Sequence, residues 1–369
     1  MFINAMFIKH IFNKKSAPDE KSGPASPPAP VNPPAHHLSE NDLQQVKRLV
    51  LGAFICFVTP KFFDWNYGSY FAVYPMILMG LVPVLTRHVV RQFLCSALFN
   101  VLVTILIADV FVDEPVIMIM LMVLVNLLCF WLMASGTAFL AGAHSVLAIH
   151  AMVQLGSYNT TDLMDLCTSH MMATLLATGS AFLAFVLFPD KTPRSPPPKP
   201  NKSYSELTHQ VLFSTGIATI SFIAFQMLDE KDSLSAQAAT LLILFPLRWS
   251  GAYAASIDRM FGTLIGSAAA ILMQLVLFTW GENITLQTMM YLLGVMVFAA
   301  EHVRERRGPA RGFCSMTALA IFFGLKSAGS DVFYTAMYRM VSVAVAVFIT
   351  LTLAYLLHRL LLRYWPTSS

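Results

Sequence analysis

The sequence predicts an all-α polytopic membrane protein with about twelve transmembrane helices in two six-helix parallel repeats. Three observations lead to this prediction. Hydrophobic residues make up 56% of the 369 residues and charged residues only 12%, whereas a soluble domain carries about 25% charged residues. The mean hydropathy is +0.64. Long apolar runs recur along the chain, and a proline-rich segment separates them into two sets of six.

Residues 1–43 predict a disordered cytoplasmic tail. The opening stretch, MFINAMFIKHIF, is too short to span a bilayer. Lys14 and Lys15 follow it, and no small-residue cleavage site is evident, so we do not expect a cleaved signal peptide. The next residues are rich in Pro, Ser and Ala and cannot bury a core.

Twelve apolar runs follow, and each is a candidate span, since crossing a bilayer takes about 20 residues of helix. In residues 44–189 the runs centre near Phe54, Ile77, Val101, Val123, Leu147 and Ser180. In residues 204–364 they centre near Ala218, Leu241, Ala269, Gly294, Ala318 and Ala346. The runs near Ile77, Leu241 and Ala318 are short or interrupted by Pro or Gly.

Residues 190–203 predict a cytoplasmic linker between the two halves, because prolines stop helices and basic residues suit the cytoplasm. The halves resemble each other weakly. The segment from Arg91 aligns with the segment from Arg259, and the segment from His170 aligns with the segment from Arg339. The two offsets, 168 and 169 residues, are nearly equal. Six spans in each half give both halves one orientation, which is a parallel repeat.

The distribution of basic residues predicts the orientation. With the N-terminus inside, twenty Lys and Arg residues lie on the inner side. The outer side then carries only four: Lys61, Lys231, Lys326 and Arg339. This positive-inside bias predicts a multi-pass protein of a bacterial inner membrane with both termini in the cytoplasm.

Four basic residues are the main candidates for binding a substrate. Arg91 and Arg259 open the third span of each half, which places them at its cytoplasmic mouth, and His170 and Arg339 open the sixth span, at its outer end. The planar fork of arginine suits carboxylates, so basic groups at both mouths favour an anionic substrate. The alternative is that arginines at helix ends only anchor the helices at lipid phosphates.

Small residues follow Arg259 on the same helical face. Gly262, Thr263 and Gly266 either let another helix approach closely, which is the more common role of such a pattern, or make room for a substrate at the entrance.

Three acidic residues near span ends are candidates for proton coupling: Asp109, Asp258 and Glu301. The alternative is that Asp258 pairs locally and that Asp109 is solvated at the membrane surface.

No motif for catalysis, nucleotide binding, haem or zinc is visible, and the five cysteines form no ligand-like pattern. We therefore expect no enzymatic activity, no catalytic residues, no metal, no cofactor and no nucleic-acid partner.

With these residues in hand, the chain resembles the fusaric-acid-resistance-like superfamily, which includes bacterial aromatic-acid exporters. Arg259, Gly262, Thr263 and Gly266 match its Arg–x–x–Gly–Thr–x–x–Gly-like signature without a gap, whereas the first half keeps only Arg91. The resemblance covers roughly residues 45–362. It implies an inner-membrane efflux permease for small organic acids, driven by the proton gradient and assisted by a periplasmic adaptor of the membrane-fusion type.

The leading hypothesis is therefore a secondary exporter of small organic anions, including aromatic ones. A passive anion channel is the first alternative. The second is a non-transporting scaffold or a subunit of an envelope assembly. Expected partners are a small anionic substrate and membrane lipid, and the sequence leaves a homo-oligomer open.

Overall fold

The computed structural model describes residues 38–194, 202–228, 234–281, 283–306, 308–324 and 332–365. The predicted tail up to residue 37, residues 195–201 of the linker, and Lys231 and Lys326 lie outside these ranges. The described residues form twelve α-helices. The first six are α1 (Glu40–Phe62), α2 (Gly68–Gly80), α3 (Arg87–Ile105), α4 (Pro115–Ala134), α5 (Phe139–Gly156) and α6 (Leu163–Leu187). The others are α7 (Tyr204–Leu228), α8 (Leu234–Ile243), α9 (Trp249–Val276), α10 (Ile284–Glu305), α11 (Arg311–Gly324) and α12 (Val332–Leu361).

The chain is a polytopic membrane protein. Eight helices are long and apolar enough to cross a bilayer: α3 (continued by a π-helical turn, Leu106–Val110), α4, α5, α6, α7, α9, α10 and α12. The apolar helices α8 and α11 are shorter. Each of the twelve predicted centres falls within a different one of the twelve helices. This confirms an all-α fold. The three runs predicted to be short or interrupted are α2, α8 and α11, with 13, 10 and 14 residues.

Local sequence sets where the helices begin. Ser39 and Asp42 form a capping box at the start of α1, so the last four residues of the predicted tail, 40–43, already belong to this helix. Asp162 caps α6 and Asn283 caps α10, each by accepting backbone N–H bonds. Pro115 occupies the first turn of α4, where its missing N–H costs nothing.

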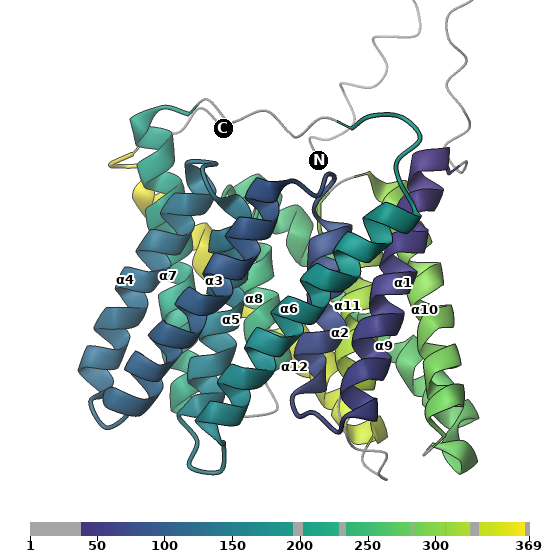
Figure 1. The fold of residues 1–369 in the computed structure, drawn as a ribbon. Helices are drawn as coiled ribbons and strands as arrows, with labels where there is room; N and C mark the ends of the chain where they lie inside the picture. The colour runs from purple at the N-terminus through teal and green to yellow at the C-terminus, as the bar shows by residue number, and fades with distance from the viewer. Residues whose placement is uncertain are drawn as a thin grey trace, which may run out of the picture. The chain divides into compact units, whose positions relative to one another are not determined.

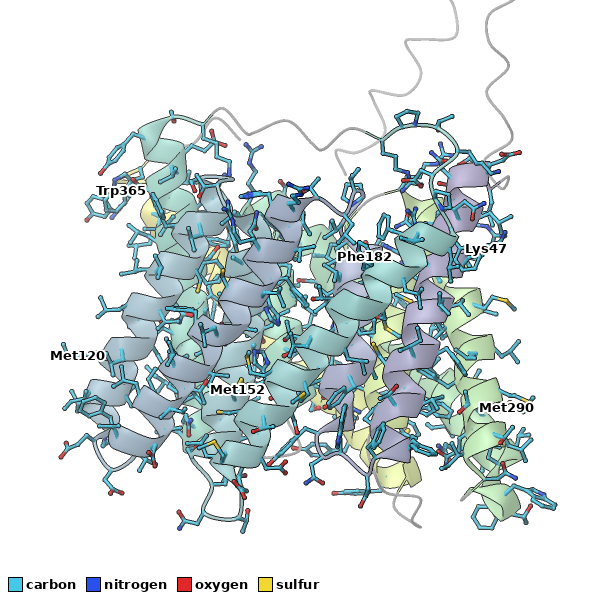
Figure 2. All side chains as sticks on the ribbon, in the orientation of Figure 1. Lys47, Met120, Met152, Phe182, Met290 and Trp365 are labelled. Atoms are coloured by element: carbon cyan, nitrogen blue, oxygen red, sulfur yellow. The ribbon has the colours of Figure 1, made fainter. Side chains whose placement is uncertain are left out.

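The outer helices turn apolar side chains away from the bundle. Met120 of α4 is exposed and projects from its edge, while Met152 of α5 is fully buried (Figure 2). On α9 the exposed face carries Phe261, Leu264 and Ile265, whereas small and polar residues face inward. This reversal of the usual pattern is expected where lipid is the solvent.

The short helices lie inside the bundle formed by residues 38–365, while α4 and α10 lie at its opposite edges (Figure 1). Helix α2 packs against α11, and α5 packs against α8, so the short helices join the two halves of the chain. The backbones of Gly68 and Gly324 touch where α2 begins and α11 ends. A side chain at either position would collide with the other helix.

Candidate functional site

A cavity of about 230 Å³ lies among the short helices. Residues of α2, α5, α8 and α11 form most of its wall, including apolar side chains such as Ile77, Leu147 and Ile321. Two arginines complete it: Arg259 from α9 and Arg339 from α12. The cavity therefore combines an apolar wall with cationic groups.

Arg259 is the buried cation of this wall, with only 3% of its surface exposed. Its Nη1 donates a hydrogen bond to Oγ1 of Thr317 on α11, at 3.2 Å. Its Nε has no hydrogen-bond partner among the described residues. The nearby carboxylate of Asp258 accepts a bond from Arg311 at 3.0 Å. Arg259 is thus held by a neutral hydroxyl and keeps donor capacity for a ligand.

Two more buried donors belong to residues that line the cavity. The hydroxyls of Tyr70 on α2 and Ser235 on α8 have no hydrogen-bond partner among the described residues. Buried polar groups are usually satisfied, so unpaired donors gathered around one cavity indicate a place for an acceptor. Tyr70, Tyr74 and Phe313 also give the wall aromatic character. These aromatic residues were not among the candidates from the sequence, although Tyr70 and Tyr74 are spaced i, i+4 beside Pro75.

The structure brings together only part of the predicted set of basic residues. Arg259 and Arg339 line the cavity. His170 is fully buried directly behind it, where its Nδ1 lies 2.6 Å from the hydroxyl oxygen of Tyr74. Arg91, by contrast, is exposed on α3 and does not line the cavity.

The expectation that Arg259 opens its helix is wrong. Helix α9 begins at Trp249, because the preceding residues, WSGAYAASI, continue the helix without a break. Arg259 therefore lies in the eleventh position of α9. His170 and Arg339 likewise lie eighth in α6 and α12, two turns from the helix start.

Gly262 and Gly266 face α11. A Cβ at Gly262 would lie 2.8 Å from the carbonyl oxygen of Arg311, and one at Gly266 would lie 2.9 Å from Cβ of Ala318. Both glycines, and Thr263 beside them, are buried at this contact, and none of the three lines the cavity. They bring α9 close enough to α11 for Arg259 to reach Thr317.

None of the three predicted proton-coupling acids is among the residues that line the cavity. Asp109 is exposed in the π-helical turn after α3. Glu301 is exposed and forms an ion pair with Arg304 at 3.5 Å. Asp258 is buried next to Arg259 but pairs with Arg311.

Each half of the chain matches a model of a known protein family. Residues 218–353 match the family model described as fusaric acid resistance protein-like. The second half of the chain is therefore similar to fusaric acid resistance protein-like domains. Residues 45–184 match a second family model, described as a protein of unknown function (DUF2955). No curated protein matches the chain, and neither does any solved structure.

The segment that matches the fusaric acid resistance protein-like model supplies both arginines of the cavity, Arg259 and Arg339, together with Thr317. The other matched segment supplies Tyr70, Tyr74 and the buried His170 behind them. The cavity is therefore shared between the two matched segments, and neither segment contains its whole wall.

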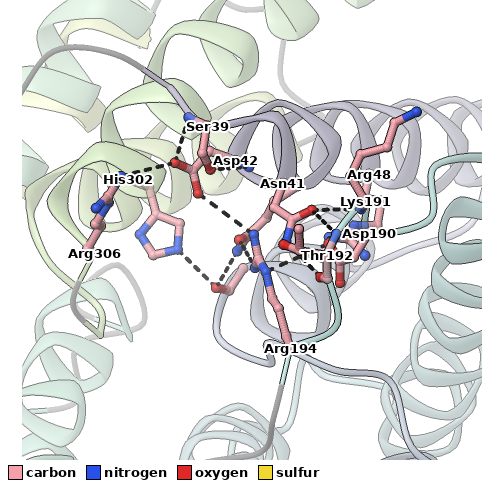
Figure 3. A network of polar contacts seen from close by, with 12 residues as sticks. Ser39, Asn41, Asp42, Arg48, Asp190, Lys191, Thr192, Arg194, His302 and Arg306 are labelled. Atoms are coloured by element: carbon pink, nitrogen blue, oxygen red, sulfur yellow. Dashed lines mark hydrogen bonds and ion pairs between the residues drawn. The ribbon is translucent and has the colours of Figure 1, made fainter. Parts of the chain in front are cut away.

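A network of charges joins helix ends at one end of the bundle (Figure 3). The buried Arg48 of α1 pairs with Asp190, just after α6, at 2.6 Å. Asp42 pairs with Arg194 at 3.7 Å and with Arg306, after α10, at 3.6 Å. The network thus connects the start of α1 to both halves of the chain. A second, wider cavity opens beside it, between Arg194 and Arg306.

Lys202 closes a similar contact at the start of α7. Its Nζ donates hydrogen bonds to the carbonyl oxygen of Ala134 at 2.8 Å and to Oε1 of Gln210 at 2.7 Å. Burial lowers the pKa of the Lys202 ammonium, and the nearby carboxylate of Glu206 opposes this effect.

Proposed function

We propose that this protein is a secondary transporter that exports small organic anions, including aromatic ones, with coupling to protons. The observation that carries the proposal is the set of buried, unpaired donors around one central cavity: Arg259 Nε, Tyr70 Oη and Ser235 Oγ. The fusaric acid resistance protein-like domain supports it, since that family is associated with efflux and transport.

The chemistry of the cavity favours a small anion. Arg259 has no carboxylate in an ion pair with it among the residues that the structure describes. A buried guanidinium in this state is costly, and a bound anion would neutralise it. The planar fork of Arg259 suits a carboxylate, and Arg339 adds a second cation to the wall. The rings of Tyr70, Tyr74 and Phe313 offer faces and edges to an aromatic substrate. A volume of about 230 Å³ suits a single small molecule, since pockets for drug-sized ligands measure about 300–1,000 Å³.

We further propose that the two halves are parallel repeats. The helix pairs that pack together in the first half are α1–α2, α1–α6, α2–α6, α3–α5, α3–α6 and α4–α5. The same six pairs, shifted by six helices, pack together in the second half. Contacts between the halves follow the same rule, because α1–α10 corresponds to α4–α7 and α2–α11 to α5–α8. The cavity would then lie on the axis that relates the halves.

The orientation belongs to the same proposal. The excess of basic residues on one side supports a bacterial inner membrane with both termini in the cytoplasm. A periplasmic adaptor would receive the substrate on the other side.

Export of benzoate from proteoliposomes tests the function. We expect proteoliposomes with the full-length protein to release preloaded benzoate faster than protein-free liposomes loaded in the same way. The Arg259→Ala variant should abolish this faster release. Arg304→Ala, which removes an exposed arginine outside the cavity, serves as the matched control and should transport normally. Unchanged export by Arg259→Ala would overturn the role of Arg259. A pH-independent anion conductance with unitary currents in planar bilayers would replace the carrier with a channel.

A further inference from the structure

A cluster of buried polar side chains extends from Tyr74 of the cavity wall to residues that lie behind it. We call Tyr74, Ser96, Asn100, His144 and His170 the histidine cluster. Each is at most 5% exposed. The rings of His144 and His170 stack with centroids 5.4 Å apart. Nδ1 of His144 lies 2.8 Å from Oγ of Ser96, and Nδ1 of His170 lies 2.6 Å from Oη of Tyr74.

We infer that His170 binds a proton together with the anion in the cavity, so that each ligand strengthens the binding of the other. This inference rests on the proposed function, since it requires that the cavity binds an anion. It assigns the proton to the histidine cluster and not to Asp109, Asp258 or Glu301.

The surroundings of His170 can accept a protonated ring, whose two nitrogens both donate. On one side, Oη of Tyr74 can accept the bond from Nδ1 and turn its own hydrogen toward the cavity. On the other side, the amide nitrogen of Asn100 lies 3.4 Å from Nε2. Oδ1 of that amide has no hydrogen-bond partner among the described residues. Rotation of the amide would present this oxygen to Nε2.

The groups that face His170 leave its charge without a built-in counter-ion. Helix α2 contributes Tyr70 and Tyr74, α5 contributes His144, and α3 contributes the neutral Asn100. Among the described residues, no carboxylate forms a hydrogen bond with His170 or His144.

Helix α1 also packs on α6, but two of its titratable groups, Cys56 and Arg48, lie nearer the C-terminal end of α6, and Lys61 donates a hydrogen bond to Gln287 of α10. Cys56 lies 3.4 Å from the hydroxyl of Ser180, ten residues beyond His170, and Arg48 pairs with Asp190. Neither group neutralises His170.

The charged groups of the cavity wall, Arg259 and Arg339, are themselves cations and oppose a positive charge on His170. Negative charge for a protonated His170 would therefore have to come from an anion bound in the cavity. A buried cation needs a nearby anion, and Tyr74 separates His170 from the cavity by one side chain. By linkage, an anion that favours protonation of His170 is itself bound more tightly when the proton is present. The two ligands would then cross the membrane together, as the neutral acid. Export would follow the concentration gradient of the acid and not exchange an outgoing anion for an incoming proton.

Isothermal titration calorimetry of the purified full-length protein with benzoate measures this linkage. Titrations near neutral pH in buffers of different ionisation enthalpy give the number of protons taken up per anion bound. We expect uptake approaching about one proton in the wild type and uptake near zero in His170→Gln. His150→Gln is the matched control, because His150 is also buried but bonds Asn126 on α4, outside the cluster. Its uptake should equal that of the wild type.

Benzoate binding without proton uptake in the wild type would overturn this inference and leave the proposed function standing. Undiminished uptake by His170→Gln would do the same. Absence of benzoate binding by the wild type would instead overturn the proposed function. If His170→Gln does not fold, Tyr74→Phe takes its place. Tyr74→Phe removes one acceptor of the protonated ring and should reduce the uptake, and unchanged uptake would contradict the inference.

Discussion

Arg259 on α9 and Thr317 on α11 are joined by a hydrogen bond of 3.2 Å at the wall of the central cavity. The bond links two helices and fixes the position of the guanidinium. There, a ligand can contact the remaining N–H donors of Arg259 and the apolar wall at the same time. The affinity of the cavity for an anion should therefore depend on Thr317, although its side chain is neutral.

Replacing Thr317 with Val should weaken benzoate binding about tenfold, because a hydrogen bond to a charged group contributes about 1.5–3 kcal/mol. Thr178→Val is the control. Both hydroxyls donate to a carbonyl oxygen of their own helix, that of Thr317 to Cys314 and that of Thr178 to Thr174, but no hydrogen bond between Thr178 and an arginine is found among the described residues. The dissociation constants from calorimetry decide the matter, and equal values for Thr317→Val and the wild type would show that Arg259 needs no such support.

The two arginines paired by the repeat should behave differently. Arg259→Ala should lose benzoate binding, whereas Arg91→Ala should bind within about twofold of the wild type, because an exposed arginine contributes little. Direct binding to the purified variants measures this difference. A similar loss of benzoate binding in both variants would show that Arg91 belongs to the binding site.

Close contact between α9 and α11 should make Gly266 intolerant of a side chain. Gly266→Ala should lower the free energy of unfolding by about 1–3 kcal/mol, since its Cβ would meet the backbone of Ser315. Gly179→Ala in α6 is the matched control, because a Cβ there meets nothing within 4 Å. Thermal unfolding in detergent should show a lower midpoint for the first variant only. An unshifted midpoint for Gly266→Ala would mean that α9 and α11 can move apart at little cost.

The stability of the protein should fall more when Asp190 alone is removed than when both Arg48 and Asp190 are replaced. Asp190→Ala leaves a buried guanidinium uncompensated, whereas Arg48→Met with Asp190→Ala removes both charges. We expect the single variant to unfold at a lower temperature than the double variant. Glu301→Ala, which opens an exposed pair, should change the midpoint little. A single variant as stable as the double variant would show that water reaches Arg48.

The twelve helices could be predicted from the sequence because apolar runs and helix breakers are local features. The site could be predicted only in part. Arg259 was found because a charge in an apolar run is conspicuous. Its position within α9 was predicted wrongly, because small residues before it extend the helix. The contact between Tyr74 and His170 joins residues 96 positions apart, and no pattern along the chain indicates such a pairing.

The reversed face of α9 has a consequence for how this protein can vary. Outward residues such as Leu264 and Ile265 are exposed on the face of α9 that turns away from the bundle, so other apolar side chains should be accepted there. Inward residues such as Gly262 and Gly266 are confined by α11 and tolerate little change in volume. Among homologous sequences, the residue type at the exposed apolar positions of α9 should therefore vary, while the small residues at the inward positions should be conserved. The least hydrophobic residues of α9 are therefore the ones that specify how the helix packs.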